Sequence, residues 1–167
     1  MMEEIIEELV VVISKEVKAF NQLLKTLREK QRAIVEGEIE RLKKQVTAET
    51  RIVHETKTLE AQRIAQTRVL AEVLALDNMN PRLSEIIEKI EAKYAQRLTE
   101  QRSLLKSLME KIRSINESNQ FLLNYSLQFI ESSLSLLLSG NDDMPVYQQD
   151  GTCQRDLRQA KILDQRI

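Results

Sequence analysis

Helix-breaking residues are rare in this sequence, and their positions limit the folds that the chain can adopt. Glycine occurs only at positions 37, 140 and 151, and proline only at positions 81 and 145. Inside a helix, glycine costs about 1 kcal/mol and proline about 3 kcal/mol relative to alanine. These five positions therefore divide the 167 residues into a few long segments, each of which can be helical.

Apolar residues recur at helical spacing in the segments between these breakers. Steps of three and four residues run through 2–36, and a weaker series runs through 38–76. Asn80 followed by Pro81 is typical of a helix start, because asparagine caps helices well and proline is tolerated at the first helical position. We therefore expect three helices, at about 2–36, 38–76 and 81–139.

The composition favours long helices over a thick globular core. Charged residues make up 31% of the chain, aromatic residues only 4%, and tryptophan is absent. This balance is typical of coiled coils. The sequence therefore predicts one all-α domain over 1–140, an elongated antiparallel helical hairpin or three-helix, coiled-coil-like bundle with a very long third helix. Residues 141–167 are expected to form a flexible tail that can end in a short amphipathic helix.

Gly37 permits two arrangements of these helices. If it closes a hairpin, the third helix runs back along the second and draws level with Gly37 near residue 120, since helices rise about 1.5 Å per residue. Residues 119–139 would then overhang the bundle. If Gly37 is only a kink, residues 121–139 would lie against the apolar stripe of the first helix as ordinary core. The sequence leaves both arrangements open.

The segment 119–139 carries a single charge, Glu131, and its apolar residues spread over two helical stripes. The first stripe consists of Leu123, Leu127, Ile130, Leu134 and Leu137, and the second of Phe121, Leu122, Tyr125, Phe129 and Leu136. About half of the segment is Asn, Gln, Ser or Glu, whereas a membrane span needs roughly 20 mostly apolar residues. We therefore expect a binding surface, a core or a homodimer interface here, and no membrane insertion.

Several function classes are unexpected for this sequence. A net charge of −1 and a pI near 6.0 give no electrostatic reason to expect nucleic acid or an anionic membrane as a partner. The acidic residues Glu3, Glu4, Glu7 and Glu8 interrupt any N-terminal signal segment, so we expect a soluble, cytoplasmic protein.

Catalytic chemistry is also unexpected. The only histidine, His54, lacks the Glu-x-x-His partner of a helical-bundle metal site, because Arg51 stands three residues before it. Cys153 lies in a polar tail with no histidine nearby in the sequence, and the three glycines form no phosphate-binding loop. We expect no enzyme activity, no metal site and no cofactor.

Three segments resemble the FlgN-type flagellar export chaperones. "AIVEGEIERLKKQVTAET" (33–50) resembles the family's Gly-acidic junction between two long helices, with Glu38 where the family often has Asp. "INESNQFLLNYSLQFIESSLSLLL" (115–138) resembles its Asn-rich step before a charge-poor helix end, and "VYQQDG" with "KILDQRI" resembles its tail. The resemblance covers essentially the whole chain, in order.

This resemblance implies a cytoplasmic chaperone of the flagellar type III secretion system that uses no ATP. Its implied partners are the hook-associated proteins that join hook to filament, whose terminal helical segments it would hold, and the flagellar export apparatus. An exposed apolar helix can bind such a segment by helix-in-groove packing. The expected client-binding residues are Leu122, Leu123, Tyr125, Leu127, Phe129, Ile130, Leu134 and Leu137. Tyr147 resembles a tail tyrosine that some members of the family present to the export gate.

Overall fold

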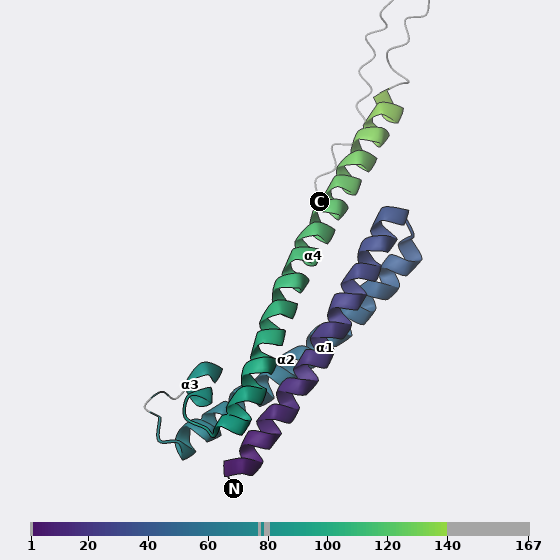
Figure 1. Cartoon of the computed structure of the whole chain (residues 1–167). Helices are drawn as coiled ribbons and strands as arrows, with labels where there is room; N and C mark the ends of the chain where they lie inside the picture. Colours follow the sequence, from purple (N-terminus) through teal and green to yellow (C-terminus); the bar gives the residue numbers. More distant parts are fainter. Residues whose placement is uncertain (1, 77, 79–80, 140–167) are drawn as a thin grey trace, which may run out of the picture. The chain divides into compact units, whose positions relative to one another are not determined.

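The computed structural model describes residues 2–76, 78 and 81–139, and within them it contains helices and no strand (Figure 1). The helices are α1 (Met2–Glu36), α2 (Ile39–Val73), α3 (Leu83–Ile87) and α4 (Ala92–Ser139). The fold is therefore all-α with a very long last helix, as the sequence predicts. The chain divides into two compact units, Met1–Asn124 and Tyr125–Ile167. The first unit contains α1, α2, α3 and the beginning of α4; the described part of the second is the remainder of α4.

Gly37 closes a tight turn between α1 and α2. Its φ is +70°, a left-handed conformation that glycine adopts without steric cost. The Glu38 N–H donates to the Ala33 carbonyl at 2.9 Å, and the Gly37 N–H donates to the Ile34 carbonyl at 3.2 Å. This pair of bonds is the Schellman motif that ends many helices. Glu38 itself makes no side-chain cap bond to α2.

After this turn, α2 runs antiparallel to α1 (Figure 1). Near the turn, Lys30 forms an ion pair with Glu49 at 2.8 Å. Further from it, Glu16 of α1 pairs with Arg63 of α2 at 3.1 Å. The arrangement is thus a hairpin, and the alternative in which Gly37 only kinks one long helix is wrong.

The open end of the hairpin holds the larger of the two buried clusters. α1 supplies four residues to it, while α2, α3 and the start of α4 supply the rest: Ile6, Leu9, Val10, Ile13, Leu70, Ile86, Tyr94 and Leu98. A smaller cluster towards the turn contains Leu23, Leu27 and Ile52, with Ile112 and Ile115 of α4 packed against it. Apolar side chains therefore hold the beginning of α4 to the hairpin at two places.

The expected single helix over 81–139 is wrong, because a turn at residues 88–91 separates α3 from α4. Arg82, which precedes α3, has an extended backbone, so the helix does not begin at Pro81. Because of this turn, two separate helices contribute to the same cluster: Ile86 from α3, which is 0% exposed, and Tyr94 from α4, which is 5% exposed.

Within the first unit, α4 runs parallel to α1. Arg97 pairs with Glu7 at 2.7 Å near the beginning of both helices, and Asn119 bonds to the Leu27 carbonyl at 2.9 Å near the other end. No Cα atom in this part of α4 comes within 8 Å of a Cα atom of α1 or α2. The α1–α2 hairpin is therefore the closely packed part, and α4 contacts it through side chains alone.

Candidate functional site

The described part of the second unit is a helix with exposed apolar side chains. Between Tyr125 and Leu138, the large apolar residues are 54% to 77% exposed, and Glu131 is the only charged residue. These residues are Tyr125, Leu127, Phe129, Ile130, Leu134, Leu136, Leu137 and Leu138. We call them the apolar surface of α4. Soluble monomers rarely expose contiguous apolar patches larger than a few hundred Å², and a larger patch usually marks an interaction site.

The local sequence explains why this segment is helical without burying these side chains. It contains no glycine or proline before position 140, and leucine, its commonest residue, is a strong helix former. Leu127, Ile130, Leu134 and Leu137 follow one another in steps of three and four, so they share one face of the helix. Such a row supplies the contacts that a partner helix needs in helix-in-groove packing.

The client-binding residues expected from the sequence fall into two groups. Leu122 and Leu123 belong to the first unit and are half-buried. The other six, from Tyr125 to Leu137, belong to the second unit and are exposed. Leu138 is exposed as well, and its only signal in the sequence is its place in the run of leucines.

The sequence also raises the question of a functional role for three other residues, of which the structure describes one. His54 is exposed on α2. Tyr147, the expected export-gate contact, and Cys153 lie outside the described residues. Among the residues that the structure describes, no group of three or more His, Cys, Asp or Glu side chains is placed to hold a metal ion.

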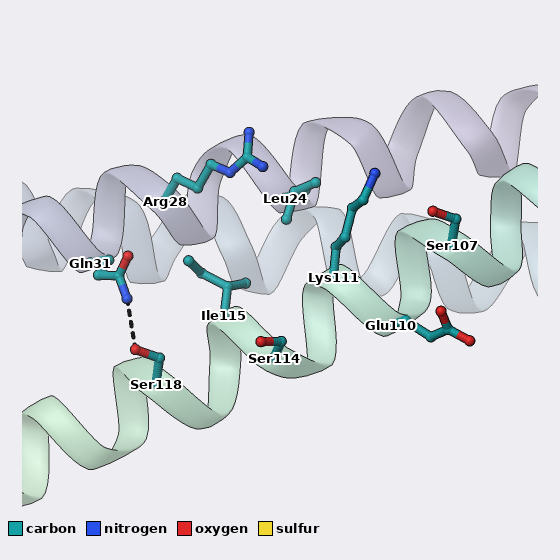
Figure 2. A pocket seen from close by; sticks show the side chains of 9 residues that line it. All are labelled: Leu24, Arg28, Gln31, Ser107, Glu110, Lys111, Ser114, Ile115 and Ser118. Carbon is teal, nitrogen blue, oxygen red and sulfur yellow. Dashed lines mark hydrogen bonds between the residues drawn. The ribbon is translucent and has the colours of Figure 1, made fainter.

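A groove of about 490 Å³ lies between α1 and α4 within the first unit (Figure 2). Leu24 and Ile115 form its apolar part, and the Gln31 amide donates to the Ser118 hydroxyl at 2.9 Å across one end. The charged side chains of Arg28, Glu110 and Lys111 also line it. The groove follows from the wide spacing between these two helices, and no motif in the sequence indicates it.

One buried carboxylate stands out in the electrostatics of the first unit. Burial raises the pKa of Glu16 above its ordinary value, and the adjacent Arg63 guanidinium partly offsets this effect. The pair lies between two helices of the hairpin and is mostly enclosed, so it acts as a structural contact rather than as a site for substrate.

By length and composition alone, the C-terminal part of α4 is apolar enough to cross a membrane. This is weak evidence, because length and composition say nothing of the environment. The same segment contains many Asn, Gln and Ser residues, and its only charge is negative. Its polar face therefore lacks the lysines and arginines that hold amphipathic helices at anionic membrane surfaces.

The fold and this surface define an all-α, hairpin-based protein with an exposed apolar helix. The model of the FlgN protein family matches residues 1–155, so the chain belongs to the FlgN family. FlgN proteins are flagellar export chaperones and are not known as enzymes. No curated protein and no solved structure matches the chain.

Proposed function

We propose that this protein is a cytoplasmic chaperone that binds the terminal helical segments of hook-associated proteins on the apolar surface of α4. The observation that carries the proposal is the exposure of this surface in a member of the FlgN family: Leu137, for example, is 77% exposed in a helical segment, 125–138, whose only charged residue is Glu131. The bound client would be kept from premature assembly and delivered to the flagellar export apparatus. The chaperone needs no ATP and no cofactor for this role.

The physical basis is the burial of two apolar helix faces against each other. Each Å² of apolar surface removed from water contributes about 25 cal/mol. A client segment that folds on binding loses part of this gain through its ordering, which costs about 2–5 kcal/mol or more. The resulting complex is stable enough to block assembly, yet it can release its client at the export gate.

The proposed client-binding residues are Leu122, Leu123, Tyr125, Leu127, Phe129, Ile130, Leu134 and Leu137. Leu123, Leu127, Ile130, Leu134 and Leu137 would form one wall of the contact, and Leu122, Tyr125 and Phe129 the other. Tyr147 is proposed as the contact to the export gate, on the basis of its resemblance to a tail tyrosine of the family.

A second candidate function is that of a structural or adaptor coiled-coil protein that dimerises through residues 119–139. The regular steps of four and three from Leu123 to Leu137 favour this alternative, since they match a heptad seam. The seam spans only about two heptads, however, whereas a coiled coil is indicated by a pattern sustained over at least about three or four heptads. We therefore expect any homodimer of the free chaperone to be weak and to give way to a client.

Substitutions on the apolar surface separate the two functions. Leu127→Asp and Ile130→Asp should abolish a soluble complex with the terminal segment of a hook-associated protein, while the helix content measured by circular dichroism stays the same. Ser132→Asp, at another exposed position of the same helix, is the matched control and should retain binding. The coiled-coil function would instead be supported if these substitutions split a homodimer and no client segment bound the unsubstituted protein at any concentration.

A further inference from the structure

Asn119 is a buried polar residue in the row of α4 side chains that faces the hairpin. This row advances in steps of four and three residues: Tyr94, Leu98, Gln101, Leu105, Leu108, Ile112, Ile115 and Asn119. Asn119 is only 1% exposed, and it is the last buried residue among the described residues of α4. A polar amide therefore occupies the position at which this row of contacts ends.

The hydrogen bonds of Asn119 are only partly satisfied. Its side-chain N–H donates to the Leu27 carbonyl of α1 at 2.9 Å, whereas its Oδ1 has no hydrogen-bond partner. An unpaired buried acceptor lowers stability, and an apolar residue in its place would avoid that cost. In coiled coils, a buried asparagine in the seam has the same cost but fixes the register of the helices.

The sequence around Asn119 shows what a change of register would do. Asn119 belongs to a series in which every member lies seven residues after the one before. The members before Asn119 are apolar: Leu98, Leu105 and Ile112. Asn119 and the members after it, Ser126 and Ser133, are polar. The row that begins at Leu123 is shifted by one residue from this series, which corresponds to a rotation of about 100° around the helix. The α4 residues that pack against the hairpin are thus different from those of the apolar stripe that begins at Leu123.

A shift of α4 by one heptad along α1 would move Asn119 to the place of Ile112. That place packs against the cluster of Leu23, Leu27 and Ile52, where the amide would lose its bond to the Leu27 carbonyl. The same shift would carry Leu122 to the place of Ile115, so most other positions of the row would stay apolar. Asn119 is therefore the residue near this end of the row that most disfavours the shifted arrangement.

We propose that Asn119 is a positioning residue that fixes the register of α4 on the hairpin. It thereby determines which α4 residues pack inside the first unit and which remain for a partner. The second part of this statement rests on the proposed function, because it assumes that a partner binds the residues from 122 onwards. The register itself does not depend on that function and can be tested on the protein alone.

The test measures the register by chemical cross-linking of introduced cysteines in the full chain carrying Cys153→Ser. The pair Gln31→Cys and Ser118→Cys reports the observed register, since these two side chains form a hydrogen bond. The pair Gln31→Cys and Tyr125→Cys reports a shift of one heptad. A bismaleimide with a short spacer is used, because the helix backbones are too far apart for a direct disulfide. Each pair is examined with and without Asn119→Leu.

Without Asn119→Leu, only the first pair is expected to cross-link efficiently. With Asn119→Leu, we expect the ratio of the first to the second cross-link to fall by at least about fivefold. Losing even a small free-energy preference for the observed register changes the ratio of the two registers by about this factor. Asn116→Leu, an exposed position on the same helix, is the control and should leave the ratio unchanged. An unchanged ratio in Asn119→Leu would overturn the proposal, even if both cross-links became weaker together. An equal effect of Asn116→Leu would overturn it as well.

Discussion

The guanidinium Nε of Arg63 lies 3.1 Å from each carboxylate oxygen of Glu16, and only 3% of the Glu16 side chain is exposed. This pair joins α2 to α1 in the middle of the hairpin, between the two apolar clusters. Breaking a buried ion pair by removing one partner is costly, because the other charge stays buried without compensation. The stability of the hairpin should therefore depend on Arg63 more than on any exposed cation.

Arg63→Met should lower the free energy of unfolding by about 3 kcal/mol, since it leaves the Glu16 carboxylate buried and unpaired. Urea denaturation followed by circular dichroism measures this change. Arg113→Met is the control, because the Arg113–Glu117 pair is exposed on α4, and its loss should change the stability by less than about 1 kcal/mol. If both variants lose a similar free energy of unfolding, the burial of Glu16 does not increase the cost of removing its partner.

Glu16 should also make the stability depend on pH. Burial raises its pKa in the folded state, so between its ordinary pKa of 4.5 and the folded value the native state binds more protons than the unfolded state. Stability from this group is fully present below the unfolded pKa and is lost as the pH rises through the folded pKa. Unfolding free energies of the unsubstituted protein and of Glu16→Gln, measured across this range, should show the unsubstituted protein losing stability relative to the variant as the pH rises. A relative gain with rising pH would mean that Arg63 outweighs the effect of burial.

The left-handed residues after α1 and α2 lead to opposite predictions for the stability of two substitutions. Both helices end in a Schellman motif: Gly37 occupies the left-handed position after α1, and Ala75, with a φ of +50°, occupies it after α2. A Cβ atom on Gly37 would meet no atom within 4 Å, so the cost of Gly37→Ala is conformational alone, about 1–2 kcal/mol. Ala75→Gly should stabilise the protein by about 1 kcal/mol for the same reason. Thermal unfolding of the two variants should therefore shift in opposite directions, and a shift in the same direction would contradict this account.

The break between the first two helices could be predicted from the sequence because its signals are local. Gly37 interrupts two segments with helical periodicity, and glycine is the residue that ends helices in the left-handed conformation. Its role as a turn rather than a kink could not be decided, since that depends on contacts such as Glu16–Arg63 between residues far apart in the sequence.

The break between α3 and α4 could not be predicted for a similar reason. Residues 88–91 contain no glycine or proline, and the apolar spacing continues across them from Ile87 through Ile90 to Tyr94. The local sequence therefore favours a continuous helix. The turn forms because it buries Ile86 and Tyr94 in one cluster with α1 and α2, which is a tertiary effect that overrides helix propensity.

The candidate site was only partly predictable. The low charge of 119–139 and its rows of leucine indicated a surface, a core or a dimer interface, but periodicity gives only the face of a helix and not what covers it. The exposure of Leu127 and Ile130 came from the structure. The same holds for the burial of Asn119, which in the sequence is only a polar interruption of the apolar row.

Binding of a client helix by residues 122–138 of α4 is tested most directly by hydrogen exchange. Exchange would be followed along the purified protein alone and with a peptide of the terminal helical segment of a hook-associated protein. We predict that amides in 122–138 exchange readily in the free protein and become protected when the peptide is added, while the α1–α2 hairpin changes little. If these amides are already among the slowest in the free protein and the peptide leaves them unchanged, the apolar surface of α4 is not the client-binding site.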